Sequence, residues 1–498
     1  MKPTASKKYC RMENIMINFN RDELRDKIYA CWLGKNIGGT IGTPFEGKRQ
    51  VNNCTGFTSK KGEPLPNDDL DLQLIWLKAL RENGPLNTDA KVLGEYWLEY
   101  IVPFWNEYGI GKANMTRGIA PPLSGQLNNH WKHSNGAWIR TEIWASLFPG
   151  NVEKAIYYAC QDAVVDHGSG EGTYAAIFVA AIEAAAFVFS DLRPLIEMGL
   201  SKIPENSKMY AYVSKVLECY DGGKTWLETR NIITDMTTSD PELGWFQAPA
   251  NVAYAVIGLL YGNGDFKETI LIACNCGDDT DCTCATAGSV LGIMHGTKII
   301  PKDWQEYIGD TIITVSVNKG ATRVPNTCTE LTDEVMDAHT VTLAPNWWPY
   351  KPEVTVTDAP TDFGGADIKN YMGRAFAMSL AERSDYYATY SSILGEAVIE
   401  YDRAPEITPL GEIKVKISIT PKLSSQKVFD VQWVTPEGFT VDGRRNLNAM
   451  YRNFHKKPAV SEYTVHVPEK IEAKNRLYAI ITCEGHFDVM TIPVTLLG

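Results

Sequence analysis

The stretch ACWLGKNIGGTIGTPFEG, residues 30–47, decides the fold because its glycines recur at every fourth position. On a helix, Gly34, Gly38 and Gly42 would share one face and leave it as bare backbone. A glycine in a helix interior costs about 1 kcal/mol relative to alanine. Close packing against a neighbour must offset that cost, so we predict a helix that touches other helices nearly backbone to backbone.

Other segments extend this helical picture to about residue 340. Gly288, Gly292 and Gly296 repeat the four-residue spacing, and residues 173–187 are alanine-rich on nearly all sides. A helix that is apolar all round is buried. With Asn20 as the N-cap of the first helix, these patterns predict a compact all-α bundle.

Two acid-rich turns lie next to the glycine-spaced segments. They read Asn67-Asp68-Asp69-Leu70-Asp71 and Gly277-Asp278-Asp279-Thr280-Asp281-Cys282. Carboxylates this close repel one another unless a cation lies among them, and crowded oxygen ligands suit Mg²⁺, Mn²⁺ or Ca²⁺. Such residues also cap helix starts, and the two roles are compatible. We predict that helix packing gathers both turns into one binuclear site.

The sequence pattern changes near residue 345, where Asn346–Tyr350 reads as a junction. Beyond it, apolar and polar residues alternate, first over 413–419 and then over 428–434, 463–467, 477–483 and 489–494. Alternation of this kind predicts a β-sandwich of mostly antiparallel strands. The expected domains are an N-terminal extension (1–20), an all-α catalytic domain (21–340) and a β-sandwich accessory domain (345–498). The accessory domain would serve in docking or stabilisation, or bind carbohydrate.

Composition limits the classes of partner. The formal net charge of −12 argues against a nucleic-acid surface. The 11 cysteines are odd in number and scattered, so they are no disulfide framework. Met1–Asn20 has no apolar signal core, and Ala175–Phe189 is too short to cross a bilayer. We therefore expect a cytoplasmic protein with no nucleic-acid or membrane partner, and leave its oligomeric state open.

Four segments give residues 20–340 a likeness to a known family. They are Ala30–Gly47, Asn67-Asp68-Asp69, the pair formed by Asn135–Arg140 and Asp166-His167, and Gly277–Cys282. Together they resemble the ADP-ribosylglycohydrolase family. The resemblance implies an all-α fold with a two-metal site, usually Mg²⁺, and cleavage of the bond at the anomeric carbon of ADP-ribose. The substrate would be a small molecule or an ADP-ribosylated protein.

The resemblance also implies roles for individual residues. Glu46 and Asp69 would be catalytic, with Glu46 as the acid/base that protonates the leaving group or activates water. The metal ligands would be Asn67, Asp68, Asp69, Asp279, Asp281 and Cys282, which would hold one or two Mg²⁺ ions or, alternatively, Mn²⁺. The substrate would contact Asn135, Gly136 and His167. Taken alone, Glu46 also reads as a helix-end carboxylate and His167 as a satisfied interior histidine.

Three positions depart from the family pattern and keep alternatives open. Asn67 replaces a threonine, Asp278 a glycine and Cys282 a hydroxyl residue. A thiol is a poor ligand for Mg²⁺, so one metal could be missing, weakly bound or completed by water. The alternatives are a related hydrolase of another furanoside or glycan, and an inactive crystallin-like structural member. A zinc site at Cys274, Cys276, Cys282 and Cys284 has unusual spacing, and buried packing explains these cysteines better.

Overall fold

The computed structural model describes residues 15–242, 244–344, 352–381, 383–422, 426–452 and 455–498. Its contacts divide the chain into two compact units. The first unit is Met1–Pro103, His130–Ala163 and Gly170–Ala381, and the second is Phe104–Asn129, Val164–Ser169 and Glu382–Gly498. The predicted junction Asn346–Tyr350 and residues 1–14 of the predicted extension lie outside the described residues. The predicted boundaries at 20, 340 and 345 stay predictions.

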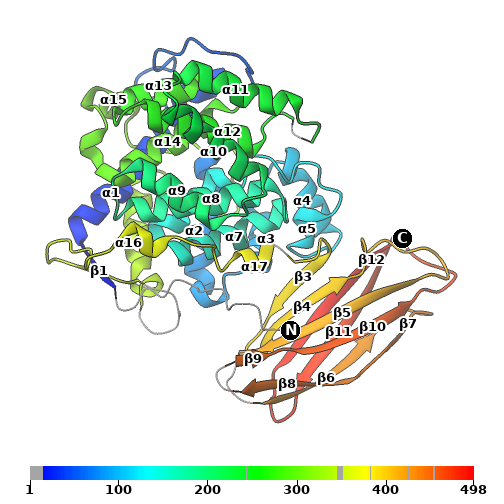
Figure 1. Cartoon of the computed structure of the whole chain (residues 1–498). Helices are drawn as coiled ribbons and strands as arrows, with labels where there is room; N and C mark the ends of the chain where they lie inside the picture. Colours follow the sequence, from blue (N-terminus) through cyan, green and yellow to red (C-terminus); the bar gives the residue numbers. More distant parts are fainter. Residues whose placement is uncertain (1–14, 243, 345–351, 382, 423–425, 453–454) are drawn as a thin grey trace, which may run out of the picture. The chain divides into compact units, whose positions relative to one another are not determined.

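The first unit is helical, as the sequence predicted (Figure 1). One parallel strand pair accompanies the helices, made of β1 (Met16–Asn20) and β2 (Glu353–Thr357). The longer helices of this unit are α1 (Arg21–Gly42), α2 (Asp68–Asn83), α3 (Ala90–Tyr100), α7 (Val152–His167, whose last turn falls in the second unit), α8 (Glu171–Ala186), α9 (Leu192–Lys202), α10 (Lys208–Asp221), α11 (Trp226–Ser239), α12 (Ala248–Tyr261), α13 (Phe266–Cys276), α14 (Thr280–His295) and α16 (Cys328–Thr342). Shorter ones are α6 (Glu142–Leu147), α15 (Lys302–Ile308) and α17 (Met378–Ala381).

The predicted start of the first helix is confirmed. Asn20 is extended at φ −63° and ψ 134°, and its side chain accepts hydrogen bonds from the backbone N–H groups of Asp22 and Glu23. These bonds satisfy two donors that have no partner inside the helix. The alanine-rich segment also forms the expected buried helix, α8, in which Glu183 is the one acid beyond the first turn.

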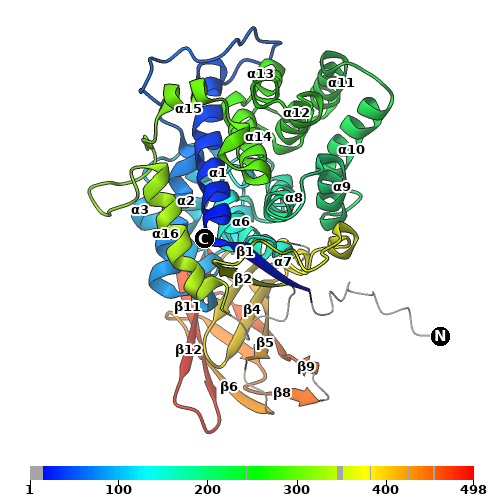
Figure 2. The same ribbon diagram turned by 90° about the vertical axis from the view of Figure 1, so that its left-hand side faces the viewer.

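Helices α1 and α14 pack against each other along the glycine faces (Figure 2). A Cβ atom added to Gly34 would lie less than 3.0 Å from Gly288, and one added to Gly38 less than 3.0 Å from Cys284. Gly42 has the same relation to Thr280. Because residue numbers rise along α1 as they fall along α14, the two helices run antiparallel. The end of α1 therefore meets the start of α14.

The start of helix α2 packs against α1 near the place where α1 meets α14. Asn67 is the N-cap of α2, and its side chain accepts a hydrogen bond from the Asp69 N–H at 2.8 Å. A Cβ on Gly39 would lie less than 3.0 Å from Asn67 Nδ2, so only glycine leaves room for the cap. Both acid turns thus reach the carboxyl end of α1.

The second unit contains the predicted sandwich of two five-stranded sheets. Their orders are β3-β4-β5-β10-β7 and β12-β11-β6-β8-β9, with antiparallel neighbours. The strands are β3 (Tyr387–Ser391), β4 (Gly395–Tyr401), β5 (Glu412–Pro421), β6 (Lys427–Val434), β7 (Thr440–Gly443), β8 (Asn446–Arg452), β9 (His455–Lys457), β10 (Ala459–His466), β11 (Lys474–Cys483) and β12 (Val489–Leu497). All five predicted strand segments are confirmed.

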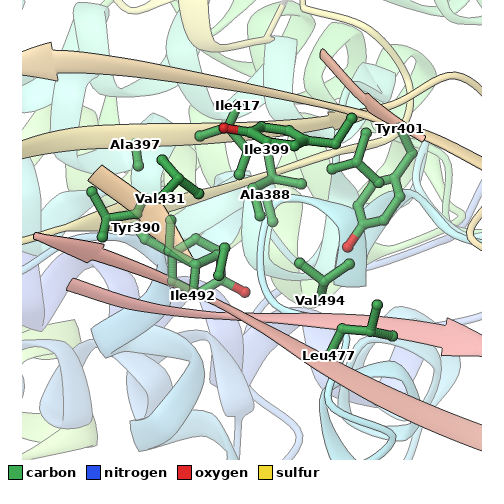
Figure 3. Close-up of a cluster of buried hydrophobic side chains, with 14 of the residues drawn as sticks. Ala388, Tyr390, Ala397, Ile399, Tyr401, Ile417, Val431, Leu477, Ile492 and Val494 are labelled. Carbon is green, nitrogen blue, oxygen red and sulfur yellow. The ribbon is translucent and has the colours of Figure 1, made fainter. Parts of the chain in front are cut away.

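The core of the second unit draws on both sheets (Figure 3). Ile399 and Ile417 come from one sheet, and Ile492 from the other. This unit also contains α4 (Asn106–Thr116) and the four-residue α5 (Leu123–Gln126). Leu123 and its neighbours Ile119 and Leu127 belong to the same buried apolar cluster as the strands. Among the described residues, no helix has both the length and the apolar character needed to cross a membrane.

Candidate metal centre

The turn before α14 is tied to the segment that follows α1. Asp278 N–H donates to the Lys48 carbonyl at 2.9 Å, and Gly47 N–H donates to the Asp278 carbonyl at 2.8 Å. Gly277 (φ 82°) and Asp278 (φ 67°) both adopt left-handed backbone, which glycine and aspartate tolerate better than most residues. These bonds hold Glu46, one residue before Gly47, next to Asp279.

Asp278, the unusual acid of this turn, has a partner of its own. Its Oδ2 lies 3.2 Å from Arg49 Nε, and its Oδ1 accepts a hydrogen bond from Phe246 N–H at 3.4 Å. Burial raises the pKa of Asp278 to about 6, while Arg49 opposes the rise. The left-handed backbone accommodates the side chain, so the added bulk does not open the turn.

Three carboxylates form the first ligand group. Glu46, Asp279 and Asp281 each offer one oxygen, and these oxygens lie within 4.8 Å of one another. Asp279 is held from two sides: its Oδ2 accepts from Asn135 Nδ2 at 2.5 Å, and its N–H donates to Asn251 Oδ1 at 3.1 Å. Because all three ligand atoms are hard oxygens, this group fits Mg²⁺ or Mn²⁺.

A second ligand group shares one residue with the first. Asp69, Asp281 and Cys282 also offer ligand atoms within 4.8 Å of one another. Asp69 is fully buried, and the Cys282 thiol donates to its Oδ1 with a separation of 3.4 Å. Asp281 is 5% exposed, and its Oδ1 has no hydrogen-bond partner among the described residues. A buried carboxylate oxygen with no hydrogen-bond partner would be satisfied by a bound cation.

The electrostatics of the centre call for a cation. Partial removal from water, together with the charges of Asp279 and Asp68, raises the pKa of Glu46 to about 7. Burial and the charges of Asp279 and Glu46 hold the pKa of Asp281 well above its usual range. Burial does the same to Asp69, against the opposing charge of Lys35. Ionising all these acids together requires compensating positive charge.

Sequence reasoning missed a buried lysine behind the centre. Lys35 Nζ lies 2.7 Å from Glu142 Oε1 and 3.4 Å from Asp69 Oδ2, and its side chain is 0% exposed. Although burial alone would lower the pKa of Lys35, Glu142 and Asp69 raise it. Its signal in the sequence is a single charged residue directly after Gly34, on a helix that buries nearly all its later turns.

Hydroxyl groups donate hydrogen bonds to two of the buried acids near this lysine. Ser289 Oγ donates to Glu142 Oε1 at 3.0 Å, and Thr141 Oγ1 donates to Glu183 Oε2 at 2.8 Å. Burial and the neighbouring Glu142 hold the pKa of Glu183 well above its usual range. Asn251, which binds the Asp279 backbone, was also missed, because nothing near it in sequence resembles a ligand motif.

Two of the predicted metal ligands, Asn67 and Asp68, belong to neither ligand group of described residues. Asn67 uses its amide oxygen to cap α2. Asp68 acts electrostatically on Glu46 and Asp69 without contributing an atom to either group of described residues. Of the four clustered cysteines, Cys282 alone belongs to a described ligand group, while Cys284 donates to the Ile270 carbonyl. The thiolate zinc alternative therefore gains no support from these residues.

The predicted substrate contacts have different surroundings. Asn135 bridges Asp279 and Trp138, whose indole N–H donates to Asn135 Oδ1 at 3.0 Å. The Gly136 carbonyl accepts from Arg140 Nη1 at 2.6 Å. His167 belongs to the second unit, where its Nδ1 lies 2.9 Å from Asp166 Oδ1. The proposed contacts of all three residues with substrate stay predictions.

The helices of the first unit surround two groups of acidic side chains that could hold a cation. The chain belongs to the ADP-ribosylglycohydrolase family, whose model matches residues 20–339. The members of this family are hydrolases that act on glycosidic bonds.

Individual relatives resemble the chain over shorter stretches. ADP-ribosylarginine hydrolase Tri1 of Serratia proteamaculans (strain 568) is 38% identical over 54 residues, and Tri1 of Pseudomonas putida (strain GB-1) is 33% identical over 54 residues. Each match covers 11% of this chain and 15% of the relative. A solved ADP-ribosylglycohydrolase-related protein complex is 20% identical at a TM-score of 0.43, covering 64% of this chain and 99% of that one.

Proposed function

We propose that this protein is a metal-dependent hydrolase of a glycosidic bond to ribose, with ADP-ribose conjugates as substrates. The observation that carries the proposal is the meeting of Glu46, Asp279 and Asp281, from two helix ends about 230 residues apart, within one ligand sphere. Family membership supports the type of bond, and the short likeness to ADP-ribosylarginine hydrolases supports the substrate class.

The proposed division of labour follows from burial. Asp279 and Asp281 are nearly buried and would hold the ion, which when bound polarises a water molecule or a sugar hydroxyl. Glu46 is exposed and offers one carboxylate oxygen to the same ligand group, so its other oxygen could accept a proton from the attacking water molecule. Asn135 orients Asp279, and the surrounding carboxylates would stabilise a positively charged, oxocarbenium-like sugar.

The substrate test is an assay panel with Mg²⁺ or Mn²⁺ present. The panel contains an ADP-ribosylarginine peptide, ADP-ribosylserine peptide, O-acetyl-ADP-ribose and aryl furanosides. We expect release of ADP-ribose from at least one of the first three, and loss of that activity in Asp279→Asn. Activity on furanosides alone would replace the proposed substrate with another glycan while leaving the metal chemistry in place.

A structural, crystallin-like role is the alternative from another class. It is favoured by Cys282 and Asn67 at positions where the resemblance expects hydroxyl residues. Calorimetric titration of the intact protein with Mn²⁺ separates the two functions. We expect binding that Asp69→Ala combined with Asp279→Ala removes, whereas no binding to the unchanged protein would favour the structural role.

We also propose a cytoplasmic location. The ten cysteines that the structure describes are buried free thiols. Free thiols persist in a reducing compartment.

A further inference from the structure

Both oxygens of the Asp69 carboxylate already have partners from the protein. Lys35 Nζ lies 3.4 Å from Oδ2, and the Cys282 thiol donates to Oδ1. The lysine, Asp69 and Cys282 are each buried. Asp281 belongs to both ligand groups, and its Oδ1 has no partner among the described residues. The second ligand group therefore contains a carboxylate, Asp69, whose charge Lys35 already balances. Among the described residues, no member of the first ligand group is paired with this lysine.

The lysine is a fixed charge rather than a mobile surface group. Its ammonium is fully enclosed and lies at hydrogen-bonding distance from Glu142. Asp69, Glu142 and Glu183 are three buried acids around this one cation, and an unpaired buried carboxylate is strongly unfavourable. Lys35 thus belongs to the folded structure and cannot leave to make room for an ion.

The second ligand group is also the weaker of the two for a hard ion. One of its three ligand atoms is a sulfur, and Mg²⁺ and Mn²⁺ prefer oxygen. A divalent cation placed there would share the Asp69 carboxylate with the Lys35 ammonium. That carboxylate already balances the charge of the lysine, so the two cations would repel each other. The first ligand group consists of three carboxylates, and the ion pairs of Lys35 go to Asp69 and Glu142, which do not belong to it.

We infer that the centre holds one hard divalent ion, at Glu46, Asp279 and Asp281, and that Lys35 serves as a built-in counter-ion in place of a second metal. This inference rests on the proposed metal-dependent function and specifies it further. Lys35 is a positioning residue: it fixes Asp69 and balances its charge without touching the substrate.

The direct test counts Mn²⁺ ions in the intact, unmodified protein. Calorimetry should give one ion per chain, and electron paramagnetic resonance should show the spectrum of an isolated Mn²⁺. Two ions about 3.5–4 Å apart, as in binuclear sites, would instead give a spin-coupled spectrum. Two ions per chain would overturn the inference and leave the proposed function intact. No bound ion would overturn the proposed function as well.

Variants then test whether Lys35 is what prevents a second ion from binding. In Lys35→Met, the stoichiometry should rise from one ion to two, because Asp69 regains a free oxygen and an unbalanced charge. Lys202→Met is the matched control, since Lys202 is also buried and pairs with Glu153 at 2.7 Å; it should still bind one ion. Cys282→Thr should remain at one ion. A second ion in Cys282→Thr alone would show that the thiol, not the ammonium, excludes it. If Lys35→Met does not fold, the spectrum of the unmodified protein still decides.

Discussion

Asp281 is the residue on which both ligand groups depend. Replacing it with asparagine keeps its shape and removes its charge. We expect Asp281→Asn to weaken Mn²⁺ binding by more than about 100-fold, beyond the roughly 10–100-fold typical of changes around the ligands. The metal-free variant should be at least as stable as the unmodified protein, because a raised pKa marks a charge that the fold disfavours. Calorimetry and thermal melting measure the two effects.

Asp278→Asn is the matched control for this prediction. It removes a carboxylate from the same turn, and asparagine tolerates the left-handed backbone at φ 67°. Since Asp278 pairs with Arg49 and belongs to neither ligand group, the ion should bind as before. Equal loss of binding in both variants would contradict the assignment of ligands.

Glu46 makes the stability of the metal-free protein depend on pH. Its pKa rises from about 4.5 to about 7 on folding. Between these values the folded state holds a proton that the unfolded state has lost, so stability falls as pH rises through this window. Metal binding needs the ionised carboxylate, so the gain in melting temperature from Mg²⁺ should be small near about pH 5 and larger near about pH 8.

The control for this pH dependence is Glu46→Gln. Glutamine cannot ionise at this position. The free energy of unfolding of the metal-free variant should therefore fall less steeply with pH between about 4.5 and about 7 than that of the unmodified protein. A gain from Mg²⁺ that is the same at both pH values would exclude Glu46 as a ligand.

At the scale of secondary structure, the α1–α14 contact sets the geometry of the centre. Gly38→Ala would place a Cβ less than 3.0 Å from the backbone of Cys284 and force the helices apart. Overpacking costs about 1–3 kcal/mol, and alanine gains roughly 1 kcal/mol in helix propensity. Because three backbone atoms would lie within 3.0 Å of the new Cβ, we expect the upper part of this range and a net loss of stability. Urea unfolding should show the loss, and Mn²⁺ affinity should fall because Glu46 and Asp279 sit on opposite sides of the contact.

Gly244→Ala supplies the comparison, because a Cβ at Gly244 would meet nothing within 4 Å. It should leave both stability and affinity unchanged. If Gly38→Ala behaved in the same way, the helices would have more freedom to separate than the packing indicates.

The helices and acid turns could be read from the sequence because their signals are local. Glycine spacing along one helix identifies a face, and an asparagine before a charged first turn identifies a cap. The partner of each face is not local information. Nothing near Lys35 in the sequence shows that its ammonium meets Glu142, 107 positions away. The same holds for Asn251, whose amide oxygen meets the Asp279 backbone only after α12 and α14 have packed.

At the scale of the whole chain, the alternation of apolar and polar residues predicted the sandwich. It did not predict that α4 and α5 belong to the same unit. Ile119, Leu123 and Leu127 lie in a segment that reads as an irregular loop, because α5 is only four residues long. Their burial depends on a sheet core formed more than 250 residues later. A periodicity argument cannot connect segments so far apart.

This arrangement predicts the behaviour of a truncated chain. A fragment ending at residue 344 would lack the strands that bury Ile119, Leu123 and Leu127. We expect it to bind a hydrophobic dye and to aggregate at concentrations where the full chain stays dispersed, because a contiguous apolar patch promotes association. Static light scattering and dye fluorescence measure this. Replacing the three residues by serine in the fragment should reduce both signals.

The strand pair β1–β2 has a mechanical consequence. Its five residue pairs run parallel, from Met16 opposite Glu353 to Asn20 opposite Thr357. Tension applied to the start of β1 and the end of β2 would pull the strands along their length, so every rung of the ladder would carry load together instead of peeling one by one. Two segments more than 300 residues apart would then act as a latch that shields the helices between them from a stretching force.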